Sequence, residues 1–279
     1  MTDENEQYSM NTGNPDITGS AWVCGDIHGE LSVLQVALRD SLMYRKRNAK
    51  VIGEKVEEAH MILLGDVGLG FPDDPAGEAL VRKMNRLAEM FRTTVYLIRG
   101  NHDNPAVWDR ARNSASLPQQ DDEHPRVVFL QDGPILVNGR RFLVIGGAAS
   151  ADVEFREEGR DWWEEEGVRV QSAFRGGGDW TGYYGILSHA GPRPSIVNPE
   201  LPTMFLAAKD AIDREQVVLG AIGNALLPSV WYHGHYHRNN VDFRYFCNLS
   251  DAGEGELAED SCVMCICTCL DIGAATPIL

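Results

Sequence analysis

Residues 93–103 read Thr-Thr-Val-Tyr-Leu-Ile-Arg-Gly-Asn-His-Asp, an apolar run followed by a glycine and polar side chains. Its first half, residues 93–98, is β-branched and apolar, which is typical of a buried strand. Gly100 then permits a sharp turn, after which Asn101 offers a neutral oxygen ligand and His102 an acid–base side chain. The stretch therefore predicts a strand whose carboxyl end carries reactive polar groups.

Other apolar runs end in the same way, with a metal-ligating side chain after the last apolar residues. In open α/β sheets, ligand sites gather at the carboxyl ends of the strands, so several such ends can meet in one crevice. Mixed carboxylate, amide and imidazole donors without cysteine suit divalent cations such as Mn, Zn, Fe or Mg. The sequence therefore predicts a metal site. The side chains that end these further runs are Asp26, Asp66, His189, His235 and His237.

Five blocks match, in order, the pattern of the calcineurin-like metallophosphoesterase family, which is D-x-H, G-D, G-N-H-D/E, a lone His and G-H-x-H. They span most of the chain, and five ordered blocks are far more specific than any one of them. The chain thus resembles the compact single-domain bacterial and phage members. The blocks are Gly25-Asp26-Ile27-His28-Gly29, Gly65-Asp66-Val67-Gly68, Gly100-Asn101-His102-Asp103, Ser188-His189-Ala190-Gly191 and Gly234-His235-Tyr236-His237.

The resemblance implies an α/β fold, a two-sheet α/β/β/α sandwich, that holds two divalent ions, with manganese the first expectation. It assigns Asp66 to both ions as a bridging ligand. Phosphate esters, either monoesters or diesters, are the implied substrates. Two such ions polarise a phosphoryl oxygen and deprotonate a water that attacks phosphorus, while His102 protonates the leaving oxygen. The other implied ligands are Asp26, His28 and His237 for one ion and Asn101, His189 and His235 for the other.

Spacing adds a geometric expectation for two of the ligand pairs. In extended backbone, residues two apart point to the same side, with Cα atoms roughly 6.5–7 Å apart. Asp26 and His28 are then able to chelate one ion, and the same geometry is expected of His235 and His237.

One block departs from the phosphoprotein-phosphatase branch of the family, whose pattern is G-D-x-x-D-R-G. Here Leu69 replaces the carboxylate that orients the catalytic histidine in that branch. We expect Asp103 or a backbone carbonyl to hold the His102 ring instead. The departure weakens an assignment as a Ser/Thr-type phosphatase. That function and dinucleoside-polyphosphate hydrolysis remain alternatives, as do a nuclease and a catalytically silent metal-binding scaffold.

Three arginines are candidates for substrate phosphate. Arg99 resembles the phosphate-contacting arginine of the phosphoprotein phosphatases, with a surface ion pair as the alternative. Arg156 and Arg160 lie in an acidic, tryptophan-bearing insert near residues 152–180, and guanidinium groups suit phosphate oxygens. Two interpretations of the insert are open, a cover that faces the substrate or an exposed acidic helix anchored by packed tryptophans.

Length and composition set the outer bounds. The 279 residues and the block order predict one domain over residues 20–279, after a polar, disordered tail at residues 1–19 without an apolar signal core. A formal charge of -16 argues against nucleic acid as a partner and leaves an anionic phosphate ester drawn in by bound metals. No run is long enough to cross a membrane, so a cytoplasmic location is expected.

Periodicity predicts the elements that surround the metal blocks. Apolar residues at helical spacing indicate helices at residues 31–42, 75–91 and 205–226. Asn138-Gly139 predicts a two-residue hairpin turn between strands at residues 135–137 and 141–145. A zinc site or disulfides are conceivable for four late cysteines, but alternation along one strand favours small core residues. These cysteines are Cys262, Cys265, Cys267 and Cys269.

Overall fold

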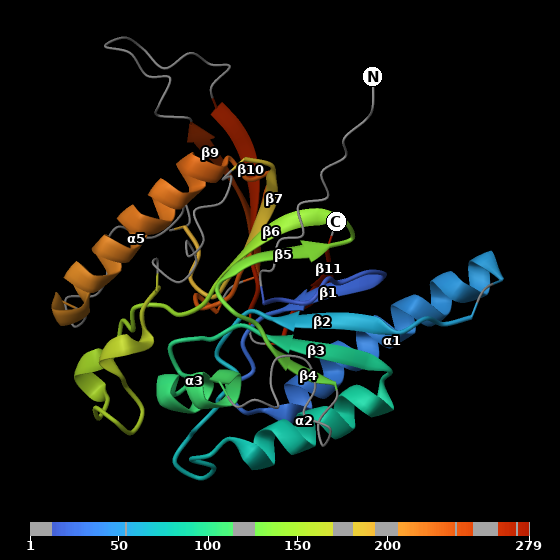
Figure 1. The fold of residues 1–279 in the computed structure, drawn as a ribbon, viewed down its shortest axis with the longest axis horizontal. Coiled ribbons are helices and arrows are strands. Elements are labelled where there is room, and N and C mark those ends of the chain that lie inside the picture. Colours follow the sequence, from blue (N-terminus) through green and yellow to red (C-terminus); the bar gives the residue numbers. More distant parts are fainter. Residues whose placement is uncertain are drawn as a thin grey trace.

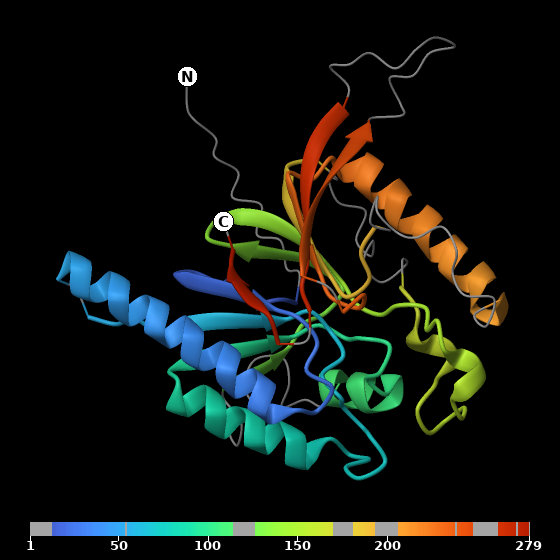
Figure 2. The same cartoon turned by 180° about the vertical axis from the view of Figure 1, so that it is seen from behind.

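The computed structural model describes residues 13–53, 55–113, 126–169, 181–192, 206–237, 239–247, 262–271 and 273–278. Two β-sheets pack face to face, and helices cover their outer faces (Figure 1, Figure 2). Three apolar clusters fill the spaces between these layers, one beneath α1 (Leu31–Ile52) and α2 (Glu78–Met90), one between the sheets and one beneath α5 (Leu206–Leu226). The predicted α/β/β/α sandwich is therefore confirmed.

The first sheet has the strand order β11-β1-β2-β3-β4, with β1 to β4 parallel and β11 antiparallel to β1. Parallel neighbours need a crossover, and helices α1 and α2 supply it as the sequence predicts. The strands are β1 (Ser20–Cys24), β2 (Ala59–Leu63), β3 (Thr93–Leu97), β4 (Val127–Phe129) and β11 (Ala275–Pro277), and the helices are α1 (Leu31–Ile52), α2 (Glu78–Met90) and α3 (Pro105–Asn113).

The second sheet has the order β5-β6-β7-β8-β10-β9, and α5 (Leu206–Leu226) covers its outer face (Figure 1). The predicted hairpin is confirmed, because Asn138 (φ 51°) and Gly139 (φ 74°) join the antiparallel pair β5 and β6 with the positive φ angles that such turns need. The strands are β5 (Gly133–Val137), β6 (Arg140–Ile145), β7 (Tyr183–Ser188), β8 (Val230–His233), β9 (Asn240–Cys247) and β10 (Cys262–Cys269).

Residues 13–19, which were predicted to belong to a disordered tail, are placed in the structure. Ile17 is fully buried, its N–H donates to the carbonyl of Leu136 (2.9 Å), and its own carbonyl accepts from the N–H of Asn138 (2.8 Å). Ile17 thus adds to the apolar core between the sheets. The polar composition of residues 13–19 gives no sign of this, because Ile17 is the one residue of the segment that is buried. Residues 1–12 lie outside the described residues.

The described part of the insert, residues 152–169, contains two single 3₁₀ turns, η1 (Val153–Phe155) and η2 (Glu164–Glu166). Of the two interpretations of the insert, the one as an acidic helix is therefore wrong in this part. The Asp161 carboxylate accepts from the N–H of Glu157 (2.6 Å), a local bond that competes with helix formation. Residues 170–180 lie outside the described part. The insert runs beside α3, where Arg169 pairs with Asp109 at 3.0 Å (Figure 1, Figure 2).

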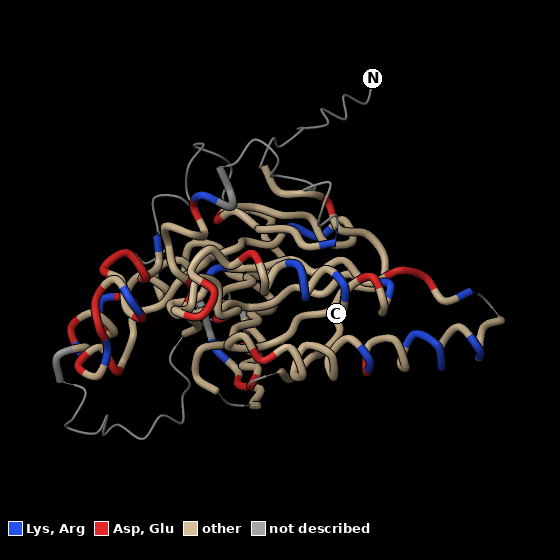
Figure 3. The backbone as a smooth tube through the Cα atoms, turned by 90° about the horizontal axis from the view of Figure 1, so that it is seen from below, with Lys and Arg blue, Asp and Glu red and all other residues tan. Residues whose placement is uncertain are grey.

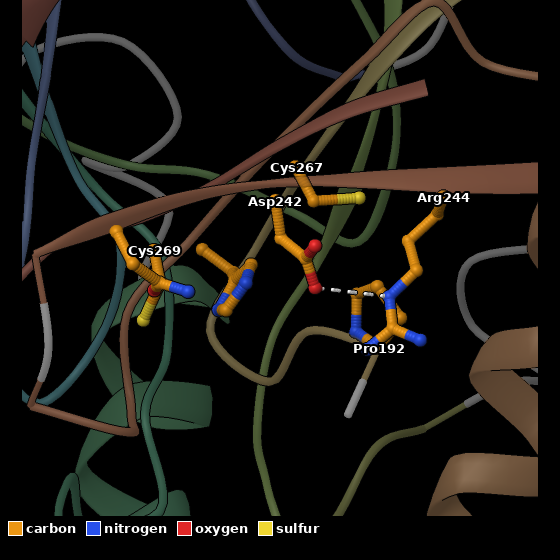
Figure 4. A pocket seen from close by; sticks show the side chains of 7 residues that line it. Pro192, Asp242, Arg244, Cys267 and Cys269 are labelled. Carbon is orange, nitrogen blue, oxygen red and sulfur yellow. Dashed lines mark ion pairs between the residues drawn. The ribbon is translucent and has the colours of Figure 1, made fainter. Parts of the chain in front are cut away.

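Three of the four late cysteines have described side chains, and all three are buried free thiols on one face of β10. Figure 4 shows Cys267 and Cys269 among the residues that line a pocket with Pro192, Asp242 and Arg244. Nε of Arg244 lies 3.5 Å from Oδ2 of Asp242 in an ion pair. Cys265 and Cys267 have their sulfur atoms 3.8 Å apart. Their packing is that of small core residues.

Charge is unevenly distributed along the backbone. Acidic positions are dense at the end of the molecule that carries the insert, while several basic positions lie along α1 (Figure 3). Among the helices that the structure describes, none is both long and apolar enough to span a bilayer.

Candidate metal centre

The ligand-bearing loops follow strands of both sheets and meet at one edge of the sandwich. Close approach of the neighbouring loops explains the glycine that precedes the ligand in several blocks. A Cβ at Gly65, which has φ 100°, would collide with the imidazole of His189, and one at Gly100 would collide with Asp66. A side chain at Gly234 would likewise strike the Asp26 carboxylate. Glycine is thus required by space as well as by turn geometry.

One set of ligand atoms comes from Asp26, His28, Asp66 and His237, and all lie within 4.8 Å of one another. The Nε2 atoms of His28 and His237 are 3.0 Å apart, and Nε2 of His237 is 3.1 Å from Oδ2 of Asp26. Nε2 of His28 lies 3.8 Å from Oδ2 of Asp66. Two carboxylates and two imidazoles facing one point form a donor set suited to a divalent cation.

A second set comes from Asp66, His189 and His235, again within 4.8 Å. Nε2 of His189 lies 3.2 Å from Oδ1 of Asp66 and 2.8 Å from the amide oxygen of Asn101, so Asn101 joins this group. Asp66 belongs to both sets, with one carboxylate oxygen directed to each. All seven predicted ligands are therefore brought together in two groups that share one carboxylate.

Neighbouring groups fix the direction in which two ligands of the second set point. Nδ1 of His189 lies 2.7 Å from the carbonyl of Leu64 and donates to it, which directs Nε2 toward Asp66, where it is available to ligate a metal once it has lost its proton. The amide nitrogen of Asn101 donates to the hydroxyl of Ser150 (2.9 Å), which turns its oxygen toward His189. Such outer contacts hold metal ligands in a set orientation.

The electrostatics of the two sets favour a cation. Burial opposes protonation of His189, yet Asp66 and Asp26 outweigh it and raise the pKa of His189 to about 10. Burial likewise raises the pKa of Asp66, but His189 and His102 hold it well below its usual range. Buried carboxylates that attract positive charge so strongly are the environment in which a divalent ion is stabilised.

The extended-backbone expectation for the paired ligands is wrong. His28 (φ 45°), His235 (φ 68°) and His237 (φ 46°) all adopt left-handed backbone, as does Asp66 (φ 47°). His235 and His237 consequently point to different ligand sets. Non-glycine residues with positive φ are uncommon and costly, and they gather at functional sites where the surrounding structure enforces them.

His102 lies beside the ligands without belonging to either set. Its backbone N–H donates to Oδ1 of Asp66 (2.8 Å), and its ring meets the ring of His28 edge-on at a centroid distance of 4.9 Å. Burial lowers the pKa of His102 to about 4, opposed by Asp66 and assisted by Arg156. The imidazole remains partly exposed, so it is accessible to a substrate.

Asp103 does not orient the His102 ring. Its carboxylate accepts backbone N–H groups from Gly68 (2.8 Å), Leu69 (2.9 Å) and Gly100 (2.8 Å), with a longer contact to Val67 (3.3 Å). The expectation that Asp103 holds the ring is therefore wrong. Asp103 instead ties the Asp66 loop to the Asn101 loop.

Arg156 of the insert reaches the His102 ring. Its Nη2 lies 2.5 Å from Nε2 of His102 and its Nη1 lies 3.3 Å from Nδ1. Because a neutral imidazole has a single acceptor nitrogen, only one of these contacts is a hydrogen bond. Asp152 orients the guanidinium through an ion pair of 2.7 Å. The insert thus faces the metal centre, as the interpretation as a cover expects.

The other two candidate arginines are placed elsewhere. Arg99 is buried and donates to the carbonyls of Glu166 (2.8 Å) and Gly167 (2.9 Å), so the alternative of a surface ion pair is wrong. Arg160 is exposed and pairs with Glu157 at 3.0 Å. Arg99 therefore anchors the insert, and Arg156 is the arginine of the three that contacts His102.

Sequence reasoning missed the groups behind Asn101. The N–H of Ser150 donates to Glu166 (2.8 Å), and the N–H of Ala149 donates to Glu215 (2.7 Å). Burial raises the pKa of both glutamates to about 7. Neither glutamate falls in a recognisable motif, and Ser150 follows an apolar run without any distinguishing spacing, so no sequence signal marks them.

Comparison with known proteins assigns the class. The family model described as calcineurin-like phosphoesterase matches residues 20–239. No curated protein matches the chain significantly. Among solved structures, a Saccharomyces cerevisiae protein serine/threonine phosphatase with similarity to human phosphatase PP5 shares 12% identity and a TM-score of 0.29, covering 91% of this chain and 82% of that one.

A cold-active protein-tyrosine phosphatase from the psychrophile Shewanella shares 16% identity and a TM-score of 0.30, covering 92% of this chain and 74% of that one. Both superpositions are weak, so the family model carries the assignment. That match extends over most of the sequence and includes every ligand described above. The class is that of metal-dependent phosphoric ester hydrolases, and the chain belongs to the calcineurin-like phosphoesterase family.

Proposed function

We propose that the protein is a dinuclear phosphoesterase that hydrolyses phosphate monoesters or diesters. The observation that carries the proposal is the shared position of Asp66, whose two oxygens face two separate groups of ligands. A carboxylate that two cations share lies naturally between two such groups, and seven donors exceed what one ion takes in a tetrahedral or octahedral site.

The residues present fit two divalent ions of the manganese, zinc, iron or magnesium kind, because the donors are carboxylate, amide oxygen and imidazole. Asp26, His28, Asp66 and His237 would hold one ion, and Asp66, Asn101, His189 and His235 the other. When bound, such ions polarise a phosphoryl oxygen and lower the pKa of a water molecule. We expect manganese to support activity best.

His102 supplies the proton in this proposal. It sits one residue after the ligand Asn101, and its Nε2 is 3.9 Å from Oδ2 of Asp66, so its ring borders the metal centre without entering it. Donation requires the imidazolium form, which the negative charge of an arriving phosphate favours. The proton passes from the ring to the leaving oxygen, so a poor leaving group departs as an alcohol.

Arg156 contacts the phosphate in this proposal. Its guanidinium is buried, paired with Asp152 and directed at the His102 ring, so it borders the same space as the proton donor. A planar guanidinium binds two phosphate oxygens at once and stabilises the charge that develops on them. A phosphate next to His102 thus has a cation from the insert on one side and the metal ligands on the other.

A hydrolysis panel tests the proposal. We expect hydrolysis of at least one of a set of phosphomonoesters, phosphodiesters, cyclic nucleotides, dinucleoside polyphosphates and phosphopeptides in the presence of Mn, Zn, Mg or Fe. Released phosphate reports on the monoesters and phosphopeptides, and the freed alcohol or nucleotide reports on the other substrates. Metal analysis of the same samples should give two ions per chain. Binding of metal without hydrolysis of any ester would instead support the scaffold alternative.

A further inference from the structure

A cavity of about 360 Å³ opens beside the first ligand set. It lies between the loop that follows β1 and the loop that leads from β2 into α2, and His28 forms part of its wall. His28 therefore belongs both to the metal centre and to this cavity. A group in the cavity and a group at the first ligand set therefore have His28 as a common neighbour.

The walls of the cavity are amphipathic. Leu31, Phe71 and Leu80 supply apolar surface, with the Phe71 ring partly exposed. The carboxylates of Glu30 and Asp73 are exposed at the opening, and Lys83 is the one cation among the lining residues. A third carboxylate, Asp74, accepts the N–H of Leu80 (2.9 Å) and so holds the start of α2.

The residues that line the cavity favour a ligand with a flat ring and hydrogen-bond donors. An aromatic wall stabilises a flat ring, and carboxylates at the rim accept hydrogen bonds from hydroxyl or amino groups. The same carboxylates repel a second anionic group, since the single amine of Lys83 offsets only part of their charge. The volume lies near the lower end of the range for small-molecule sites, so it matches one ring-bearing group.

We propose that this cavity binds the organic half of the phosphate ester, and that this half is a ring-bearing alcohol with hydrogen-bond donors and no second anionic group. The inference rests on the proposed function, because only phosphate held at the metal ligands places the ester's other half next to His28. Glu30 and Asp73 accept from the alcohol, and Phe71 packs against its ring.

The test uses three esters with the Mn-loaded full chain. Adenosine 5′-monophosphate carries a donor-rich ring, ethyl phosphate lacks the ring, and adenosine 3′,5′-bisphosphate adds a second anion. We expect the first to have the highest kcat/KM. In Phe71→Ala the preference for adenosine 5′-monophosphate over ethyl phosphate should fall about 5- to 10-fold, the size of a lost aromatic contact. Phe243→Ala, exposed on β9, is the matched control and should keep the wild-type preference.

Charge selection is tested by the double variant Glu30→Gln with Asp73→Asn. The ratio of kcat/KM for adenosine 5′-monophosphate to kcat/KM for adenosine 3′,5′-bisphosphate should fall several-fold relative to wild type, because the carboxylates that repel the second anion are gone. An unchanged ratio in this variant, together with an unchanged ring preference in Phe71→Ala, would overturn the assignment of the cavity while leaving the hydrolase intact.

Binding of the alcohol alone tests the role of the cavity separately from hydrolysis. Equilibrium dialysis of adenosine against chelator-treated protein should show binding to wild type and Phe243→Ala and weaker binding to Phe71→Ala. Hydrolysis of esters without any adenosine binding would refute the cavity's role. Adenosine binding without hydrolysis of any ester under any metal would refute the proposed function and support the cavity as a binding site.

Discussion

The metal-ligand loops and the insert border the same site, but they are held by different means. The ligand loops are tied together by buried bonds, including the Asp103 carboxylate that accepts N–H groups from two loops. The described insert is held by Arg99 at its base, while exposed pairs such as Arg160 with Glu157 shape its outer turn. Buried bonds within the scaffold define geometry, whereas the exposed outer turn of a surface loop can change without disturbing it.

The largest effect should come from the residue common to both ligand sets. Asp66→Asn removes the negative charge of the carboxylate that two cations are proposed to share. Hydrolysis should therefore fall to background, and metal content should drop below two ions per chain. Metal analysis and phosphate release measure this. Asp40→Asn, an exposed carboxylate on α1, is the control. Full activity at unchanged metal content in Asp66→Asn would remove the dinuclear proposal.

The next effect concerns proton transfer. His102→Ala should keep its metals and lose about 10² to 10⁴ in rate on an alkyl ester, the usual contribution of a general acid. The loss on an activated aryl ester should be much smaller, since that leaving group needs little help from a proton. Steady-state kinetics on both esters decide the matter. Equal losses would mean that His102 contacts phosphate or positions water instead.

The third prediction compares Arg99, which anchors the insert, with Arg156, which is proposed to contact the substrate phosphate. Arg99→Ala leaves the carbonyls of Glu166 and Gly167 without their donor, so the free energy of unfolding should fall by about 1–3 kcal/mol. Arg156→Ala should preserve stability and instead lower kcat/KM about 10- to 100-fold. Urea titration and kinetics on both variants provide the comparison. Reversed outcomes would exchange the roles given to Arg99 and Arg156.

The same contrast explains what the sequence could predict. The ligand blocks follow strand ends, and a strand, a glycine and a polar side chain are each determined within a few residues, so these blocks could be matched to a family pattern that names all seven candidate ligands. The two helices of the first sheet and the Asn138-Gly139 turn are local in the same sense. The positive φ angles of the histidines were not predictable, because distant backbone contacts enforce them.

The insert resisted prediction for the opposite reason. Its conformation depends on Arg99 and Asp109, which lie at least forty residues away in the sequence, and on side-chain bonds that compete with a helix. Its acidic composition suggested a helix, and the structure contains short turns. Ser150 and the two buried glutamates were missed because only three-dimensional packing brings them behind Asn101.

The smallest effect probes the junction where the insert meets a ligand loop, at Glu166. Burial raises the pKa of Glu166 to about 7, so the folded chain keeps this proton at pH values where the unfolded chain has released it. Between pH 4.5 and 7 the folded state therefore binds more protons, and the free energy of unfolding must fall as the pH rises. Above pH 7 this contribution is lost, and its size is at most about 3 kcal/mol.

Glu166→Gln removes the titrating group while keeping an acceptor for the N–H of Ser150. In chelator-treated protein, the fall in unfolding free energy between pH 5 and pH 7.5 should therefore be smaller in Glu166→Gln than in wild type. The exposed insert residue Glu154 gives the control Glu154→Gln, which should follow the wild-type curve. Because the histidines of the metal centre titrate in all three proteins, their contribution cancels in the difference. Parallel curves for Glu166→Gln and wild type would show that Glu166 is ionised in the folded protein, and the junction would then be held by charge.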